Sequence, residues 1–473
     1  MATYRTTLFF RRAKKALKVL REKGPQEFYN RVKDFIRRRG QIEVLTRHTA
    51  PLEYDRVPVH FAGKKLDHDM LLHSLERLKS LPFSLALSQD DYVHVVGGVQ
   101  LKLADQQREM NLHGQAYLHL SPYLVRNTLD FSDQPGVMRL TLDGQFLGYV
   151  DDETLLSVLA TLIGHGTLRS IELHHLMGWK PGYIAHILDM AGKSPIHLWL
   201  HDFFSICPNY VLLRNDREYC HAPDPQSNAC KVCYYGSIRP LHYQAIENLI
   251  QRYPIQAVAP SEFALELWRQ KFPVFNGEGL VIPNATLVWD DKFTSTDKDK
   301  ALRVAFVGYP VMHKGWQTWL NLTEKFGQDP RYEFFHFSAD WQRSPNFEKV
   351  SVIVNPQNRS AMTDALHDNE IDVAFLWSIC PETFSFTLYE SLAAGCYVVT
   401  NPASGNIQST IIKNPQIGVV YLNETELVQA FEEGSIIQNF VDFNENHRRT
   451  AMMTINVDTM EDQEKIIDSP VVL

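Results

Sequence analysis

Two successive series of strand-like and helix-like segments constrain the fold of this chain more than any other feature of its sequence. Short apolar runs, typical of buried strands, alternate with longer segments of helical periodicity, first over residues 84–259 and again over 303–422. Such alternation predicts parallel sheets with helices on both faces. Between the two series lies 290–300, a stretch of Asp, Lys, Thr and Ser that is typical of a solvated linker. We therefore expect an α/β protein with two Rossmann-like, doubly wound domains.

The chain of 473 residues is long enough for two domains with an extension at each end. Apolar residues make up 44% of the total, which suffices for a core in each domain. The predicted parts are a basic helical N-terminal extension at 1–80, a first Rossmann-like domain at 81–295, a second at 296–437 and a C-terminal tail at 438–473. Because doubly wound sheets bind ligands at the carboxyl ends of their strands, the functional site is expected in a cleft that these ends face.

Charge is spread unevenly along the chain. Residues 1–40 contain thirteen Lys and Arg and three acids, so they carry +10, and the net charge of −8 leaves −18 on the remaining 433 residues. An acidic body argues against a nucleic-acid-binding protein. Phe9, Ala13 and Leu17 recur at helical spacing among the basic residues, which favours an interfacial helix on an anionic membrane. The alternative is a pair of solvated helices that pack on the first domain or on a partner enzyme.

No segment has the sequence pattern of a secretory signal or of a membrane span. The apolar run Leu8–Phe10 is too short for a signal core and continues into basic residues. The most apolar helical stretch, Leu155–Ile163, has about half the length needed to cross a bilayer. The expected location is therefore the cytoplasm, with peripheral attachment to the inner face of the membrane through the basic extension.

The strongest motif is a strand-to-helix turn in the second domain, with the sequence Pro-Glu-Thr-Phe-Ser-Phe-Thr-Leu-Tyr-Glu at 381–390. A helix that begins at 383–385 would offer the free N–H groups of its first turn to a phosphate or a sugar hydroxyl. Glu390 follows Glu382 by eight residues, about two helical turns, so both carboxylates are expected on one side, where they suit sugar and ribose hydroxyls. A single Glu in such a place would more simply be a solvated acid beside a capped helix.

This turn resembles the E-x7-E motif of retaining GT-B glycosyltransferases, in particular those of family 4, and the surrounding strands extend the resemblance over about residues 84–422. In that family the first Glu contacts the donor sugar and the second contacts the ribose, which implies these roles for Glu382 and Glu390. The resemblance further implies a hexosyltransferase-type enzyme that takes a sugar from a UDP- or GDP-sugar with retention. It also implies that no cofactor is required for catalysis.

A second match lies at 307–316, which resembles the first strand-to-helix turn of the family's C-terminal domain. The family's glycine corresponds to Gly308, and its Lys before a second glycine corresponds to Lys314. A cation there would stabilise the leaving nucleoside diphosphate. The family's Arg after the first glycine is replaced by Tyr309, so His313 or a distant Arg has to compensate, or the diphosphate is held more weakly.

A pair of glycines in the first domain, Gly97 and Gly98, precedes a predicted helix at 99–111. Glycine pairs are common in turns, and this one gains weight because it follows the first strand and opens a helix. It resembles the family's Gly-Gly loop, in which the backbone approaches the donor phosphate.

Two polar pairs follow later strands of the first domain. The pair His174-His175 resembles the family's histidine near the donor sugar, with His174 favoured, and His201-Asp202 resembles a pair near the acceptor. Asp202 is a candidate base or positioning group for the acceptor. The resemblance thus assigns catalysis to His174, His201, Asp202, Lys314 and Glu382. It assigns donor binding to Gly97, Gly98, Gly308, Lys314, Glu382, Thr383, Phe384, Ser385 and Glu390.

Four of the six cysteines fall within 27 residues, namely Cys207, Cys220, Cys230 and Cys233. The last two have the two-residue spacing of a zinc site, and four thiolates would complete a structural tetrahedron, with His221 as an alternative ligand. A set of free thiols in a loop is an equal alternative, whereas disulfides do not suit a cytoplasmic protein. Cys380 and Cys396 are interpreted as packing residues.

The sequence as a whole predicts a glycosyltransferase that acts on a glycan or a lipid-linked glycan in bacterial cell-surface polysaccharide biosynthesis. One alternative is a catalytically inactive GT-B protein that binds glycans or serves as a scaffold, which the replacement of the family's Arg by Tyr309 keeps open. Another is a different GT-B enzyme acting on sugar nucleotides or sugar phosphates, such as an epimerase or a phosphorylase. The residue pattern does not identify the sugar, the nucleotide base, the acceptor or the linkage.

Overall fold

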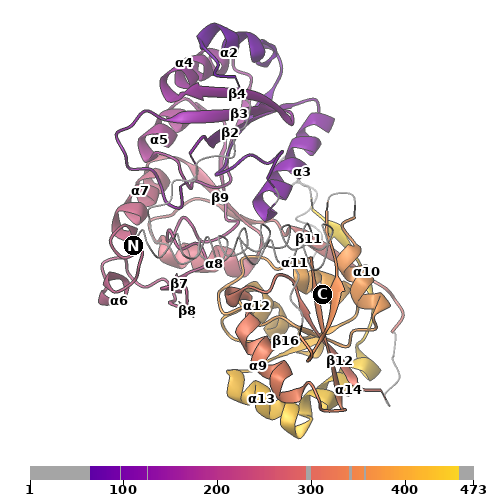
Figure 1. Cartoon of the computed structure of the whole chain (residues 1–473). Coiled ribbons are helices and arrows are strands. Elements are labelled where there is room, and N and C mark those ends of the chain that lie inside the picture. The colour runs from indigo at the N-terminus through magenta and orange to yellow at the C-terminus, as the bar shows by residue number, and fades with distance from the viewer. Residues whose placement is uncertain are drawn as a thin grey trace, which may run out of the picture. The chain divides into compact units, whose positions relative to one another are not determined.

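The computed structural model describes residues 64–95, 97–124, 126–293, 300–339, 344–355 and 358–456. All of them belong to one compact unit that begins at Asp55. Two large sheets form its framework, one coloured from indigo to magenta and the other from orange to yellow in Figure 1. The basic residues 1–40, and with them the predicted membrane contact, lie outside the described ranges. Within those ranges no helix combines the length and the apolar composition that a membrane crossing requires.

The first sheet has eight strands in the order β10-β9-β6-β5-β1-β2-β3-β4. They are β1 (Phe83–Leu87), β2 (Ala116–Pro122), β3 (Val137–Leu142), β4 (Gln145–Asp151), β5 (Leu168–Leu173), β6 (Ile196–Trp199), β9 (Ile255–Ala259) and β10 (Gly279–Val281). The six strands from β10 to β2 are parallel, whereas β3 pairs antiparallel with both β2 and β4. Along the chain β2 is added on one side of β1 and β5 on the other, so the switch point lies between β1 and β5.

The local sequence explains several elements around this sheet. The predicted hairpin at 137–150 is confirmed, and its turn holds Asp143 and Gly144 at φ 49° and 79°, the positive angles of a type I′ turn. The predicted helix at 99–111 is confirmed as α3. The helices around the sheet are α2 (His68–Ser74), α3 (Gly98–Leu112), α4 (Asp152–Ile163), α5 (Pro181–Asp189), α6 (Asn228–Lys231), α7 (Arg239–Arg252) and α8 (Glu262–Lys271), with the short 3-10 helix η1 (Glu76–Lys79).

Helix α4 shows how sequence periodicity sets the packing on the sheet. Its buried side chains recur at helical spacing and are Leu155, Val158, Leu159 and Leu162. The carboxylate of Asp151 accepts a hydrogen bond from the Thr154 N–H (2.9 Å) and so caps the start of the helix. The helix therefore begins where the strand β4 ends and turns one apolar stripe to the core.

The second sheet has six parallel strands in the order β14-β13-β12-β15-β16-β17. They are β12 (Leu302–Val307), β13 (Tyr332–Ser338), β14 (Glu348–Ser351), β15 (Val373–Phe375), β16 (Tyr397–Thr400) and β17 (Gly418–Val420). In chain order this is the arrangement of a Rossmann sheet, with the switch point between β12 and β15. Both faces of β12 are covered, because Val304 and Phe306 belong to one buried apolar cluster and Ala305 and Val307 to another. The predicted fold class, α/β with two Rossmann-like sheets, is confirmed.

In the described part of the chain, six α-helices, the 3-10 helices η2 (Met312–Lys314) and η3 (Pro415–Ile417), and a short strand pair accompany the second sheet. The helices are α9 (Trp316–Phe326), α10 (Ala361–Asp368), α11 (Phe386–Ala393), α12 (Asn406–Lys413), α13 (Glu424–Glu433) and α14 (Ser435–Asn446), and the antiparallel pair is β11 (Ala285–Trp289) with β18 (Ala451–Ile455). The predicted domain limits remain predictions, but two of them divide packed elements. The limit at 437 falls inside α14, whose Phe440 and Phe443 join the core of the second sheet. Leu71 and Leu78, on the N-terminal side of the limit at 80, are buried in the core of the first sheet.

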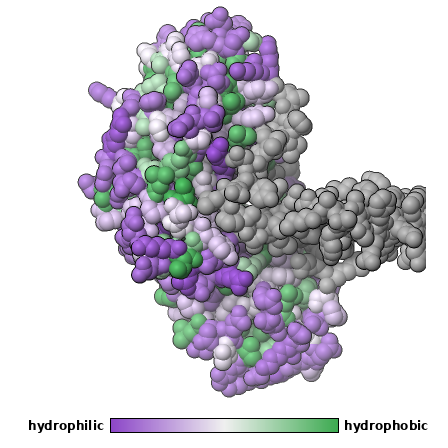
Figure 2. All heavy atoms as spheres, turned by 60° about the vertical axis from the view of Figure 1, so that its left-hand side comes forward, coloured by the Kyte–Doolittle hydropathy of each residue, from purple (hydrophilic) through white to green (hydrophobic). Residues whose placement is uncertain are grey.

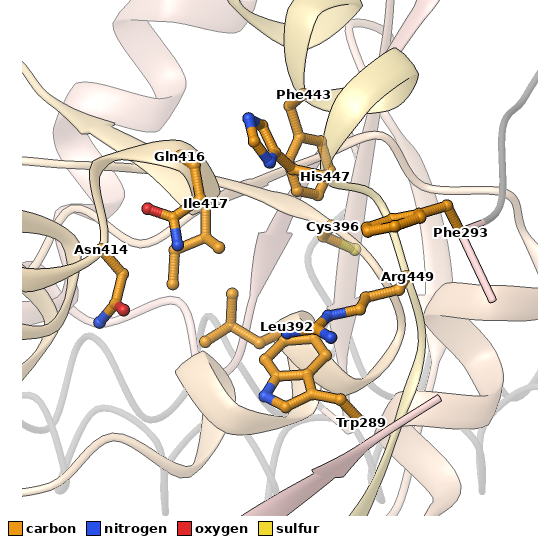
Figure 3. A pocket seen from close by; sticks show the side chains of 10 residues that line it. All are labelled: Trp289, Phe293, Leu392, Cys396, Asn414, Gln416, Ile417, Phe443, His447 and Arg449. Carbon is orange, nitrogen blue, oxygen red and sulfur yellow. The ribbon is translucent and has the colours of Figure 1, made fainter. Parts of the chain in front are cut away.

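The surface and one cavity bear on where a ligand could bind. On the face shown in Figure 2 the described residues are mainly hydrophilic, and the hydrophobic ones lie in small separate groups. A cavity of about 150 Å³ is lined by Trp289, Leu392, Cys396 and other side chains (Figure 3). The Arg449 guanidinium lies 4.7 Å from the ring centroid of Trp289 in this lining. The loops after β12 and β15 contribute no lining residue, so the cavity is separate from the switch point of the second sheet.

Candidate functional site

At the switch point of the second sheet, the loop after β12 lies against the loop after β15. The Ile379 N–H donates to the carbonyl of His313 (2.9 Å), and the Ser378 hydroxyl oxygen lies 3.1 Å from the same carbonyl oxygen. Gly315 permits this approach, because its φ is +82° and a Cβ there would collide with the Trp377 carbonyl. The glycine that follows the predicted lysine is therefore required by the contact between the two loops.

Lys314 and Glu382 meet between these loops. The Lys314 ammonium donates to Oε1 of Glu382 (2.6 Å), and the Ser378 hydroxyl donates to the same oxygen (2.9 Å). The two side chains are 37% and 13% exposed, so the pair is partly shielded but reachable from solvent. Burial alone would raise the pKa of Glu382 and lower that of Lys314, but the pairing outweighs burial, so the pKa of Glu382 lies below its usual value and that of Lys314 above. Both groups are therefore charged at neutral pH.

The backbone of Glu382 is held by a neighbouring turn. It forms an isolated parallel bridge with Gly405, and the Asn406 N–H donates to the Glu382 carbonyl (2.9 Å). Gly405 has φ +64°, and a Cβ there would lie 2.6 Å from the Glu382 nitrogen. The extended conformation of Glu382 is thus fixed from the opposite side of the loop, and its carboxylate points to Lys314.

The segment 383–385 differs from its prediction. Helix α11 begins at Phe386, so these three residues precede it, and the two-turn spacing argument for Glu382 and Glu390 is wrong because Glu382 lies outside the helix. The Ser385 N–H is not free but donates to Asn406 Oδ1 (3.3 Å), and the Ser385 hydroxyl caps α11 by accepting from the Leu388 N–H (3.3 Å). The capping role arises because a serine hydroxyl satisfies the first-turn amides better than solvent does.

The other two residues of this segment also have protein partners. The Thr383 hydroxyl donates to the carbonyl of His201 (2.6 Å), and the Thr383 carbonyl accepts from the Ser261 hydroxyl (2.7 Å). Both partners follow strands of the first sheet. Phe384 is buried and stacks on Tyr389, with ring centroids 4.6 Å apart. Thr383 therefore joins loops of the two sheets, and its predicted contact with a donor stays a prediction.

Glu390, on the second turn of α11, has an unusual environment. The residue is only 5% exposed, and burial is the cause of its pKa shift, with no ion pair among the described residues to offset it. Burial raises its pKa from 4.5 to about 7. A buried carboxyl without an ion-pair partner is costly for the free protein and suits hydroxyl donors from a ligand.

At the carboxyl ends of β5 and β6, three neutral side chains form a hydrogen-bonded row, Gln106–His174–His201. His174 Nδ1 lies 2.9 Å from His201 Nε2, and His174 Nε2 lies 2.8 Å from the amide oxygen of Gln106. The ring of His174 also stacks on Trp199. Burial lowers the pKa of His174 well below its usual value and that of His201 to about 3. Because both nitrogens of the buried His174 have protein partners, the geometry favours His174 as a positioning residue for His201 over direct contact with a sugar.

Asp202 follows His201 in the sequence and is more accessible to solvent than the buried His174. Its Oδ2 is 3.0 Å from Nε2 of His175, and its Oδ1 accepts from the Phe204 N–H (2.8 Å). Its side chain is 26% exposed. Burial would raise the pKa of Asp202, but His175 and the backbone donor outweigh it and leave the pKa below its usual value. The site thus offers an ionised, partly exposed carboxylate next to His201.

The three predicted glycines lie at strand-to-helix turns. Gly97 caps the N-terminus of α3, and a Cβ added to Gly98 would meet no atom of the described residues within 4 Å. The open space at Gly98 leaves room for a ligand against the first turn of α3. Gly308 has φ +113°, and a Cβ there would lie 3.7 Å from the methyl group of Thr387 in α11. The loop after β12 therefore also borders the start of α11.

Four residues with roles at the site were not predicted from sequence. Ser378 holds the Glu382 carboxylate, Gln106 holds His174, Ser261 bonds to the Thr383 carbonyl, and Arg359 pairs with Asp105 of α3 (3.1 Å). Ser378 and Ser261 had a sequence signal, since each follows the end of a strand as ligand-binding residues do. The others contact residues 60 or more positions away, and their local patterns resemble those of ordinary polar surface positions.

Comparisons with known proteins give structural similarity alone. No family model matches the sequence, and no curated protein matches it. Sucrose-phosphate synthase from Thermosynechococcus elongatus is 14% identical, with a TM-score of 0.45, over 77% of this chain and 93% of that one. HepE from Anabaena, solved with UDP-glucose, is 13% identical with a TM-score of 0.43 over 77% and 93%. The pneumococcal O-GlcNAc transferase GtfA, solved with UDP and GlcNAc, is 9% identical with a TM-score of 0.44 over 77% and 96%. Similarities at this level assign the chain no substrate.

Proposed function

We propose that this protein is a glycosyltransferase that transfers a sugar from a nucleotide-sugar donor to an acceptor. The observation that carries the proposal is the Lys314–Glu382 pair, which joins the two loops at the switch point of a Rossmann sheet. Ligands of such sheets bind at the switch point, and a cation there suits a diphosphate. The carboxylate of Glu382 suits a sugar hydroxyl, which would donate a hydrogen bond to it.

The chemistry follows from where charge develops. When the bond between the anomeric carbon and the diphosphate oxygen breaks, negative charge grows on the leaving diphosphate. The Lys314 ammonium, already fixed by its neighbours, stabilises that charge without reorganising in the reaction. The acceptor hydroxyl forms the new bond to the anomeric carbon, and its proton passes to the departing phosphate or to Asp202. In this scheme Glu390 binds the ribose.

The loops of the first sheet supply the acceptor side. Asp202 is an ionised, partly exposed carboxylate, and His201 is held by His174. The donor is a UDP- or GDP-sugar, and transfer occurs with retention. The acceptor is a glycan or a lipid-linked glycan of a bacterial cell surface, and residues 1–40 hold the cytoplasmic protein to the inner face of the membrane. Catalysis by these residues requires no cofactor.

Donor hydrolysis tests the proposal without knowledge of the acceptor. Purified protein is incubated with common UDP- and GDP-sugars, and release of the nucleoside diphosphate is followed. Hydrolysis of one donor by the wild type and a loss of about 100- to 1000-fold in Lys314→Ala are expected, since removing one preorganised donor to a developing anion has this effect. The matched control is Lys325→Ala, because Lys325 forms a similar lysine–glutamate pair with Glu432 outside the site.

A second candidate is a non-catalytic GT-B protein that binds glycans. One observation favours it, namely that Tyr309 stands where the family has an Arg and is 63% exposed. A protein of this kind would bind a nucleotide or a glycan but hydrolyse no donor. Absence of hydrolysis with every donor, in protein that is folded by circular dichroism, would therefore replace the first proposal by the second.

A further inference from the structure

The loop between β6 and α7 contains four cysteines that the proposed reaction does not use. Cys207, Cys220, Cys230 and Cys233 all line one cavity of about 20 Å³. About 10–15 Å³ accommodates one water-sized sphere, so this space is large enough for a single ion. Cysteines that are 26 positions apart in the chain are thus gathered around one small void.

The cavity also contains a buried positive charge. Arg239, the first residue of α7, is 3% exposed, and its guanidinium donates to Sγ of Cys230 and to the Ile206 carbonyl (3.5 Å). Among the described residues no carboxylate forms an ion pair with Arg239. A buried cation without an anion is unfavourable, so the surroundings of Arg239 require a negative charge. Four thiolates bound to a divalent metal supply this negative charge, because together with the metal they carry a net negative charge.

The backbone of this loop has little regular structure to hold its shape. Its elements are β7 (Leu213–Arg214), β8 (Glu218–Tyr219) and the four-residue α6. Of seven non-glycine residues with positive φ in the described part of the chain, five lie in this loop: Leu212, Asn215, Asp216, His221 and Ala222. Asn and Asp adopt such conformations readily, whereas for Leu212 and Ala222 they are unfavourable and persist only where surrounding contacts fix them. A loop with this much backbone strain and so few ladder hydrogen bonds needs a cross-link.

We propose that Cys207, Cys220, Cys230 and Cys233 bind one structural Zn²⁺ ion, with Arg239 as the buried counter-charge. Zinc in such sites is tetrahedral, with sulfur ligands at about 2.3 Å. Among the described residues no three or more His, Cys, Asp or Glu side chains stand in metal-binding geometry, so the sulfurs have to turn inward on binding. Cys220 Sγ now contacts the Leu212 carbonyl (3.1 Å), and Cys230 Sγ contacts Arg239. On binding, the four thiols lose their protons to solvent and no electron is transferred.

The metal would fix the loop that follows His201 and Asp202. Cys207 is five residues after Asp202, and its N–H donates to the Phe203 carbonyl (3.1 Å). The opposite end of the loop leads into α7, whose His242 Nε2 lies 2.6 Å from the Phe204 carbonyl. A cross-link at this point therefore holds the segment that carries the accessible carboxylate. This inference does not depend on the proposed sugar transfer.

Metal content and thiol protection in the full-length protein test the inference. Protein purified without chelators is analysed by mass spectrometry for bound metals, and about one zinc per chain is expected in the wild type and in the control Cys396→Ser. The control removes a buried cysteine of the second sheet. Loss of zinc is expected in Cys230→Ser/Cys233→Ser.

Alkylation of the wild type provides the second readout, which is independent of how the variant folds. The four thiols should be protected in the native protein and become reactive after treatment with a strong chelator, as mapped by peptide mass spectrometry. Cobalt substitution should give the absorption bands of a tetrahedral thiolate site. The inference would be overturned if the thiols reacted equally with and without the chelator, or if they formed disulfides with one another. It would also be overturned if the protein contained iron with inorganic sulfide, or if the double variant retained zinc.

Discussion

Replacement of Glu390 by Gln is expected to stabilise the ligand-free protein and to weaken its binding of a nucleotide sugar. The carboxyl is 5% exposed, and burial raises its pKa from 4.5 to about 7. In the unfolded chain Glu390 loses its proton near pH 4.5, while in the folded protein it keeps the proton up to about pH 7. The folded state therefore loses stability as the pH rises from 4.5 to 7, and the full cost is present above pH 7. Glutamine, which is neutral at every pH, avoids this cost.

The magnitude follows from the pKa shift. At 1.36 kcal/mol per pKa unit, a rise from 4.5 to about 7 corresponds to about 3 kcal/mol at pH 8 and to less than about 1 kcal/mol at pH 5. For a domain of the size of the second sheet and its helices, about 3 kcal/mol raises the melting temperature by roughly 6–12 °C.

Thermal unfolding at pH 8 and pH 5 measures this difference. Glu390→Gln is compared with the wild type and with Glu348→Gln, which replaces an exposed glutamate of β14. The expected result is a large gain at pH 8, a small one at pH 5, and none in the control. Equal melting temperatures of Glu390→Gln and wild type at pH 8, or the same gain at both pH values, would show that the Glu390 carboxylate does not destabilise the folded protein. Donor binding by Glu390→Gln should fall by about 10- to 100-fold, because a hydrogen bond to a charged group contributes about 1.5–3 kcal/mol.

Three further predictions concern the loops and the core. Gly315→Ala should weaken donor binding and lower the melting temperature, because φ is +82° and the new Cβ would meet the Trp377 carbonyl; calorimetry of both properties checks it. Ser385→Ala should cost about 1 kcal/mol of stability through loss of the α11 cap and should also weaken donor binding. Asn423→Ala, which removes the cap of the distant α13, should cost about as much stability and leave binding unchanged. Burial lowers the pKa of His119 to about 3, so the unfolded chain takes up a proton below pH 6.5 that the folded state does not. Stability should therefore fall between pH 7 and 5 by about 2 kcal/mol more in the wild type than in His119→Asn, as measured by chemical unfolding.

The sequence predicted what depends on local patterns. Helix α3, the hairpin at Asp143-Gly144 and the strands that precede Gly308 and His174 follow from apolar periodicity and turn chemistry, and the structure confirms them. The placement of Lys314 and Glu382 on loops that follow strands of the second sheet was also predicted, whereas their contact depends on β12 lying beside β15, which the sequence did not indicate.

What the sequence did not predict depends on distant contacts. Helix α11 begins at Phe386, after the expected start at 383–385, because the bridge from Glu382 to Gly405 keeps the preceding segment extended. The pairing of β11 with β18 joins segments about 170 positions apart, and no local pattern indicates it. The partners of His174 and Thr383 are likewise distant in sequence, so the sequence could not predict that these two side chains hydrogen-bond to the protein itself.

Titration of UDP and GDP into the purified protein by isothermal calorimetry tests whether a nucleotide binds beside Lys314. We expect selective binding of one nucleotide by the wild type and by Lys325→Ala, and strongly weakened binding by Lys314→Ala. Binding that is unchanged in Lys314→Ala, or absent for both nucleotides in folded wild-type protein, would contradict a donor site at the switch point of the second sheet.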